Sequence, residues 1–191
     1  EAAAMGSLAA VILAIIYRKM TWDIAKRAAI ETLRVSSFVL LIAGICYAYV
    51  GVFMSAGCGD VVENAILSVP GGKWGSFFVI MLIVFLLGMF IEWIGIVFII
   101  VPILSPVIVA LGFDPLWAGM MVCINLQMAF QTPPMAMSVF VCQGTSPPEL
   151  GVKLHDIIKG VIPFIAIIAF WLLMFSFYPQ LITWLPNLMM K

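Results

Sequence analysis

A run of apolar residues from position 74 to position 112 constrains the fold of this chain more than any other feature of its sequence. As a single helix, at about 1.5 Å per residue, the run would be roughly 60 Å long, about twice the hydrocarbon thickness of a bilayer. Glu92 is the only charged residue within it, and a glycine follows closely. We therefore predict a helical hairpin that turns at residues 92–95, with Pro102 and Pro106 kinking or interrupting its second arm.

The composition is that of a membrane protein: 65% of the residues are hydrophobic, 9% are charged, and the mean hydropathy is +1.23. Soluble domains carry about a quarter charged residues, so we predict an all-α polytopic membrane protein that contacts the lipid bilayer. Nine basic and nine acidic side chains cancel, which argues against a nucleic-acid partner because such a partner needs a basic face. The four cysteines form no CxxC pair, so we expect small buried side chains and no transition-metal site.

Residues 1–56 are predicted to form scaffold-like helices. After a first apolar helix, residues 21–34 have the charge pattern of a helix that lies on the cytoplasmic membrane surface, capped by Thr21. A plain cytosolic linker helix is the alternative for that segment. Residues 35–56 are long enough for a full span. Because the chain opens at Glu1 on an apolar run without a methionine, we interpret it as a fragment whose N-terminal part is missing.

The polar stretches farther along divide the chain into segments. Residues 57–73 are predicted to be a periplasmic connection that contains one short helix over 61–67. Residues 144–158 are predicted to be a cytoplasmic loop. Residues 159–191 then form a final transmembrane helix, broken late by Pro179, and the C-terminus.

The distribution of lysine and arginine sets the orientation. If residues 35–56 cross the membrane and residues 116–141 cross back, seven of the nine cations share one side: Arg18, Lys19, Lys26, Arg27, Arg34, Lys153 and Lys159. We therefore place that side in the cytoplasm and the hairpin over 74–112 on the outer side. The count leaves open whether the hairpin is re-entrant or makes two full spans.

The apolar segment that follows the hairpin is interrupted in its middle by Gln131, Thr132, Pro133 and Pro134. Two consecutive prolines remove two backbone donors and disfavour helix at the residue before them. We expect the carbonyls from position 130 to 132 to be freed and the helix to resume over 135–141. A simple proline kink is the alternative.

The sequence contains no nucleotide-binding P-loop, no HExxH and no GxSxG, and its one histidine, His155, lies among charged loop residues. We therefore expect no enzymatic activity. A lone carboxylate and a broken backbone at membrane depth both indicate function. Residues 74–143 are interpreted as a transport core in which Glu92 at the hairpin tip and oxygen atoms of the break bind a small cation, while half-helix N-termini suit an anionic substrate group.

Each part of this site has a structural alternative. Glu92 could instead be an interfacial turn residue between two complete spans. Asn125 and Gln127 are polar residues within the span before the break; they could support the site or hydrogen-bond a neighbouring helix, and we favour the helix contact for Asn125.

Five blocks of the sequence carry a family resemblance: GMFIEW, VPILSPVIVALGFDPLW, NLQMAFQTPP, DIIKGVIPF and WLPNLM. In this order they resemble the C-terminal half of the large membrane (permease) subunit of TRAP, or tripartite ATP-independent periplasmic, transporters. The opening EAAA also resembles a conserved segment of that family. The resemblance covers nearly the whole chain.

The resemblance implies the second inverted repeat of an elevator-type, sodium-driven importer of organic acids (carboxylates) in the bacterial inner membrane. It implies Na⁺ as the coupling ion, no cofactor, and two partners: a small membrane subunit and a periplasmic substrate-binding protein. By the same resemblance, residues 74–112 are an outward-facing re-entrant hairpin and residues 116–141 are the broken helix beside it. The family's sodium-binding tip acid and TPP break fall on Glu92 and on Thr132, Pro133 and Pro134, with Gly95 and Gln131 beside them.

The chain departs from the family pattern at the candidate site. The tip acid is Glu92 rather than the usual aspartate, and Trp93, Ile94 and Gly95 stand where a threonine or serine is common. Ala129 and Ala136 replace glycines around the TPP break. Two alternatives to sodium coupling remain open: a proton-coupled carrier of the same fold, in which Glu92 titrates, and a membrane scaffold that does not transport.

Overall fold

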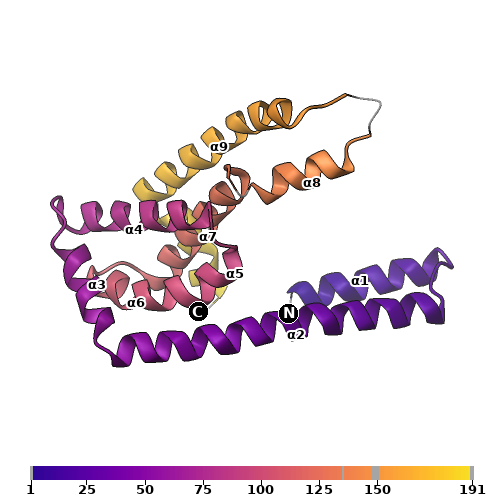
Figure 1. Cartoon of the computed structure of the whole chain (residues 1–191), viewed down its shortest axis with the longest axis horizontal. Coiled ribbons are helices and arrows are strands. Elements are labelled where there is room, and N and C mark those ends of the chain that lie inside the picture. The colour runs from indigo at the N-terminus through magenta and orange to yellow at the C-terminus, as the bar shows by residue number, and fades with distance from the viewer. Residues whose placement is uncertain (1, 135, 148–150, 190–191) are drawn as a thin grey trace. The chain divides into compact units, whose positions relative to one another are not determined.

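The computed structural model describes residues 2–134, 136–147 and 151–189, and these ranges contain helices and connections but no strand (Figure 1). The predicted helix start at residue 135 lies outside the described residues. The chain divides into two compact units, Glu1–Gly44 and Ile45–Lys191. Three helical stretches are long and apolar enough to cross a membrane: Trp22–Ser55, Trp93–Ala110 and Leu154–Phe177. The all-helical, multi-pass character predicted from composition is confirmed.

The first unit contains α1 (Ala2–Ile16) and the first part of α2 (Trp22–Ser55). The Ile24 amide donates to the Thr21 hydroxyl over 3.3 Å, which confirms Thr21 as the cap. The predicted division between a surface helix over 21–34 and a span over 35–56 is wrong, because α2 is continuous through both. The sequence steps from charged to apolar at this point but contains no proline or glycine there, and a change of polarity alone leaves the helical hydrogen bonds intact.

The second unit begins with the end of α2 and continues through α3 (Cys58–Leu67) into α4 (Gly72–Gly88). Helix α3 covers the predicted 61–67 segment and starts three residues earlier. The chain then reverses, and a second arm follows as α5 (Trp93–Gly95), the π-helix η1 (Ile96–Ile100) and α6 (Val101–Ala110). The run from 74 to 112 therefore folds into a helical hairpin, as predicted.

The hairpin turns slightly earlier than predicted. Helix α4 ends at Gly88, and the chain reverses over residues 89–92 rather than 92–95. Glu92 is the N-cap of the second arm with extended dihedral angles (φ −61°, ψ 144°), whereas Gly95 is helical (φ −62°, ψ −40°). The chain reverses mainly over the residues before Glu92, so Gly95 already lies inside the second arm.

The second arm is interrupted just before Pro102, as predicted. Pro102 has no amide hydrogen and its ring crowds the carbonyl one turn earlier, so the α-helical hydrogen-bond pattern cannot run through this turn unchanged. Residues Ile96–Ile100, which end two positions before Pro102, adopt the wider π-helical geometry. Pro106 lies inside α6 without ending that helix.

The broken helix consists of α7 (Pro115–Gln131) and α8 (Met137–Thr145). The Asp114 carboxylate caps α7 by accepting a hydrogen bond from the Leu116 amide over 2.8 Å. The predicted loop over 144–158 is shorter in the structure, because α8 extends to Thr145 and α9 (Leu154–Phe177) begins before residue 159. A capping interaction explains the early start: the Lys153 amide donates to the Asp156 carboxylate over 3.1 Å.

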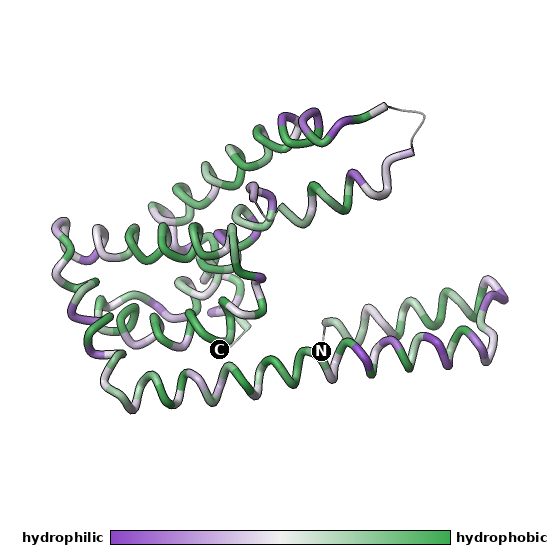
Figure 2. The backbone as a smooth tube through the Cα atoms, in the orientation of Figure 1, coloured by the Kyte–Doolittle hydropathy of each residue, from purple (hydrophilic) through white to green (hydrophobic). Residues whose placement is uncertain are grey.

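Helix α9 ends at Phe177, and α10 (Gln180–Met189) follows the predicted break at Pro179. The core of the second unit lies where α4, α6 and α7 pack together, with α3, η1 and α9 around them. Its fully buried side chains include Phe77, Ile80, Val84, Ile96 and Met121. Figure 2 shows hydrophobic residues along most of α4 and α9, with hydrophilic residues gathered at the beginning of α2 and of α9.

Candidate functional site

The tip of the hairpin is held against α7 by a close helix contact. Gly88, the last residue of α4, faces Ala129 near the end of α7. A Cβ atom added at position 88 would lie 2.7 Å from the Ala129 Cβ atom, which is closer than two carbon atoms can pack. Only glycine therefore allows α4 to approach α7 this closely at this level.

A buried hydrogen bond fixes the same two helices farther from the tip. The Asn125 side-chain amide, 1% exposed, donates to the Met81 carbonyl over 2.7 Å. The predicted helix contact of Asn125 is present. This residue therefore aligns α7 with α4, and its donor group is used within the protein.

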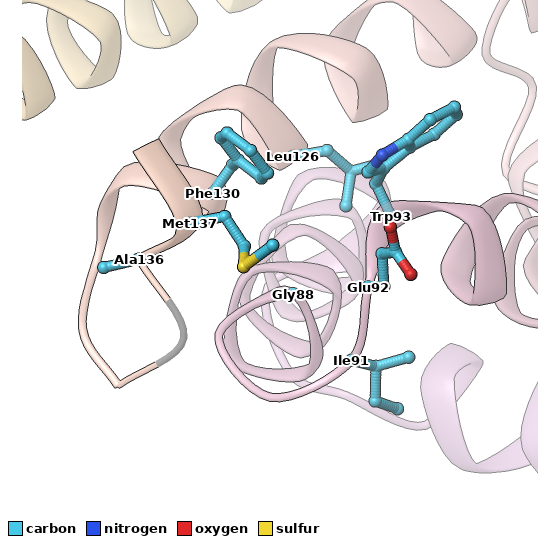
Figure 3. A pocket seen from close by; sticks show the side chains of 8 residues that line it. All are labelled: Gly88, Ile91, Glu92, Trp93, Leu126, Phe130, Ala136 and Met137. Carbon is cyan, nitrogen blue, oxygen red and sulfur yellow. The ribbon is translucent and has the colours of Figure 1, made fainter. Parts of the chain in front are cut away.

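Glu92 lies at the mouth of a pocket between the hairpin tip and the broken helix (Figure 3). The pocket has a volume of about 110 Å³, and its lining is apolar except for Glu92: Gly88, Ile91, Glu92, Trp93, Leu126, Phe130, Ala136 and Met137. Figure 3 shows Phe130 and Met137, from the two sides of the break, across the pocket from Glu92 and Trp93. The hairpin acid and the helix break are thus brought together.

The backbone of the break is partly satisfied by its own side chains. Thr132 is extended (φ −95°, ψ 130°), and its hydroxyl donates to the Met128 carbonyl over 2.9 Å. The Ser138 hydroxyl donates to the Phe130 carbonyl over 3.4 Å, and the Ala136 amide donates to the Thr132 carbonyl over 3.4 Å. The predicted free carbonyls of Phe130 and Thr132 therefore already accept one hydrogen bond each, although each keeps a second lone pair.

Ala136 begins α8 in an unusual backbone conformation. Its φ angle is +24°, in the region that residues with a side chain rarely adopt, and it is 2% exposed. Alanine pays a conformational cost here that glycine would not. The residue lines the Glu92 pocket, so the strained backbone lies at the candidate site itself.

The other predicted site residues lie around this pocket. Within the described residues, Gly95, Gln131, Thr132, Pro133 and Pro134 are not part of its lining. Gln131 and Thr132 are half-buried, and the two prolines are exposed.

Gln127 lines an adjoining pocket of about 370 Å³ that shares Trp93, Leu126 and Phe130 with the first. Sequence reasoning missed Gly88, Phe130 and Met137 because an apolar residue that lines a pocket has the same sequence signal as one in the core.

The described residues contain no group of three His, Cys, Asp or Glu side chains that could hold a metal ion. The predicted oxygen ligands are the Glu92 carboxylate, which belongs to the pocket lining, and the backbone carbonyls of the break, of which Gln131 and Thr132 lie outside that lining. Such hard oxygen ligands suit a small hydrated or partly dehydrated cation rather than a soft metal.

Comparison with known proteins places the sequence of this chain in a family. The profile described as "Tripartite ATP-independent periplasmic transporter, DctM component" matches residues 1–181. The chain is 28% identical over 131 residues to the C4-dicarboxylate TRAP transporter large permease protein DctM of Vibrio cholerae, an alignment that covers 69% of this chain and 28% of that protein.

Two further relatives align along almost the whole chain. The sialic acid TRAP transporter large permease protein SiaM of Vibrio cholerae is 27% identical over 98% of this chain and 43% of its own length. The 2,3-diketo-L-gulonate TRAP transporter large permease protein YiaN of Escherichia coli is 27% identical over 95% of this chain and 42% of its own length. The chain therefore spans less than half the length of these curated relatives.

Proposed function

This chain belongs to the DctM component family of tripartite ATP-independent periplasmic transporters, and on that premise we propose that it forms half of the transport core of a sodium-coupled importer of organic acids. The observation that carries the proposal is the pocket that Glu92 lines together with residues from both sides of the helix break. Relatives named for C4-dicarboxylate, sialic acid and diketogulonate transport support an acidic solute.

We assign the coupling sodium ion to oxygen atoms of Glu92, of the Gln131–Thr132 backbone and of the Thr132 hydroxyl. Pro133 and Pro134 keep this backbone out of helical geometry, and the second lone pairs of its carbonyls can coordinate a cation. The N-termini of α5 and α8 flank the pocket, and an interrupted membrane helix presents its positive end to an anionic substrate group. Gly95 and Gln127 support the site from the second arm and from α7.

The length of the first arm supports a re-entrant hairpin, whereas the second arm, Trp93–Ala110, is long enough to cross a membrane. Helix α4 has 17 residues, which corresponds to roughly 25 Å and falls short of a hydrocarbon core about 30 Å thick. The hairpin tip then lies within the membrane, where a lone carboxylate is costly and is retained for function. This arrangement is the one expected for the second of two inverted repeats in an elevator-type carrier.

Membership of the family supports a proposal for the assembly. We propose that the complete protein lies in the bacterial inner membrane with residues 144–158 in the cytoplasm and 57–73 in the periplasm, since this orientation places most of the cations inside. We further propose that it works with a small membrane subunit and a periplasmic substrate-binding protein. The relatives' name, a tripartite transporter, supports both partners.

The decisive experiment is uptake of a radiolabelled organic acid by proteoliposomes that contain the complete permease with its small subunit and binding protein. An inward sodium gradient should drive accumulation, and a proton gradient alone should not. Uptake that follows the proton gradient without sodium would establish a proton-coupled carrier instead. Uptake unchanged in Glu92→Gln and Thr132→Ala variants would indicate that this half is a scaffold.

A further inference from the structure

A third pocket lies at the opposite end of α4 from the hairpin tip. It has a volume of about 250 Å³ and combines charged, aromatic and hydroxyl groups from four segments: Lys73, Trp74, Gly112, Phe113, Asp114, Trp117, Pro179 and Thr183. These residues belong to the start of α4, the connection between α6 and α7, the start of α7, and α10 with the residue before it. None of them lines the Glu92 pocket.

The wall of this pocket is a fixed aromatic cluster. The Phe113 and Trp117 rings stack at 5.3 Å with an angle of 26°, and Trp74 meets Phe113 edge-on at 5.2 Å. The Trp117 indole N–H donates to the Phe175 carbonyl over 3.0 Å, which ties the cluster to α9. A wall built this way presents a rigid surface to a ligand, with little side-chain entropy left to lose.

The pocket also holds one cation and one anion that are not paired with each other. The Lys73 ammonium lies 5.3 Å from the centre of the Phe113 ring. The Asp114 carboxylate uses one oxygen atom to cap α7. In the described parts of the chain the ion pairs join Arg27 to Asp23 and Arg34 to Glu31, so both charges in this pocket are available to a ligand.

The surroundings of the pocket have the helix ends and the residue pattern expected at a membrane–water interface. Helices α4 and α7 begin here, α6 and α9 end here, and α10 packs against α7 and α9. Along α10 the polar residues recur at Gln180, Thr183 and Asn187. The remaining surface is apolar and exposed, with Leu181, Trp184, Leu185 and Leu188, which is the pattern of a helix that lies in the plane of the interface.

An apolar groove adjoins the pocket, between α4 and the end of α9. It has a volume of about 270 Å³ and is lined by Trp74, Phe78, Ser176 and Phe177. Trp74 belongs to the lining of both cavities, so the charged pocket and the apolar groove lie side by side. A ligand that fits both has a charged head with two opposite charges and a long apolar tail.

We propose that this pocket binds the headgroup of a phosphatidylethanolamine-type phospholipid, whose acyl chain lies in the groove beside Phe78. Lys73 and the Thr183 hydroxyl contact the phosphate, and the free oxygen of Asp114 accepts a hydrogen bond from the primary ammonium. A choline headgroup fits less well, because its methylated nitrogen donates no hydrogen bond and Lys73 already occupies the face of Phe113.

Native mass spectrometry of the complete, delipidated permease tests this proposal with phosphatidylethanolamine, phosphatidylcholine and phosphatidylglycerol that carry the same acyl chains. We expect the ethanolamine lipid to bind most tightly. Lys73→Ala should weaken its binding about three- to tenfold, and Lys73→Arg should restore it. Asp114→Asn should lower the preference for ethanolamine over glycerol by a similar factor while still capping α7, because asparagine is also a good N-cap.

Matched controls are Lys159→Ala and Asp60→Asn, which remove exposed charges elsewhere and should leave lipid binding unchanged. Circular dichroism and gel filtration establish that each variant is folded. Equal binding of the three lipids would overturn the proposal, as would equal losses in the control variants. Free phosphoethanolamine that displaces the lipid at similar concentrations would show that the pocket recognises a soluble phosphate ester instead of a membrane lipid.

Discussion

The Asn125 side-chain amide on α7 donates a hydrogen bond to the Met81 backbone carbonyl on α4, across 2.7 Å and within the protein interior. This contact joins the first arm of the hairpin to the helix that contains the break. It lies two turns from the tip, and together with the Gly88–Ala129 contact it determines how the two elements that form the Glu92 pocket are aligned.

Asn125→Ala should lower the stability of the complete permease. The substitution removes a buried hydrogen bond and leaves a small cavity, and we expect a loss of about 1–2 kcal/mol in the free energy of unfolding. The melting temperature in detergent measures the effect. Gln127→Ala is the control, since Gln127 is exposed on the same helix, and it should leave the melting temperature nearly unchanged. Equal shifts in both variants would contradict a structural role for Asn125.

Gly88→Ala should push the hairpin tip away from α7. The new methyl group would overlap Ala129, and we expect overpacking to cost roughly 1–3 kcal/mol of stability and to reduce transport. The double variant Gly88→Ala/Ala129→Gly should recover much of the loss in a double-mutant cycle. Gly119→Ala on α7, where a methyl group would meet nothing within 4 Å, should be neutral or slightly stabilising. Additive effects of Gly88→Ala and Ala129→Gly on stability would show that the two positions do not interact.

Glu92→Gln keeps the size of the side chain and removes its charge. If the carboxylate coordinates the coupling ion, sodium-driven uptake should fall at least about tenfold, because a neutral amide binds a cation far less well in a low-dielectric site. Glu63→Gln on α3 is the matched control and should transport normally. The melting temperature should rise with added sodium in the wild type and in the control but not in Glu92→Gln. A sodium-induced rise that persists in Glu92→Gln would remove this residue from the ion site.

Thr132→Ala separates ion binding from helix structure. Thr132 and Thr145 each donate to the carbonyl four residues earlier, over 2.9 Å in both cases, so Thr132→Ala and Thr145→Ala lose the same kind of local hydrogen bond. Both should lower stability by about 0.5–1.5 kcal/mol. Only Thr132→Ala should also weaken the apparent sodium affinity, by roughly fivefold. Identical sodium dependence in the two variants would assign Thr132 a purely structural role.

The hairpin and the break could be predicted from the sequence because each depends on local chemistry. A continuous apolar run that exceeds the bilayer thickness must reverse, and two adjacent prolines must interrupt a helix. The segment from 21 to 55 was predicted wrongly as two helices, since polarity indicates where a helix lies relative to water but does not determine where it ends. The turn lies at 89–92 and not at the predicted 92–95. Glu92 was correctly expected at the reversal, but it was predicted at the centre of the turn, whereas it is the last residue of the turn and caps the second arm.

The contacts that shape the candidate site depend on residues far apart in the chain. Gly88 and Ala129 are ordinary small residues in the sequence, and nothing local shows that they touch. The same is true of Phe130 and Met137, whose positions on the two sides of the break bring them to face Glu92. The residue types of this site can be read from a single sequence, but which of them lie opposite one another across the pocket cannot.

The π-helical turn Ile96–Ile100 has a consequence for how this hairpin tolerates change. A π turn accommodates one more residue than an α turn, so a one-residue deletion here would convert the segment to regular α-helix and leave the turns after it facing the same way. The same deletion inside α6, which is regular α-helix, would rotate everything after it by about 100°. Leu104, Val107 and Ile108, which are buried in the core, should therefore stay buried after a deletion at the π turn. A change of length in this arm is thus best absorbed at Ile96–Ile100.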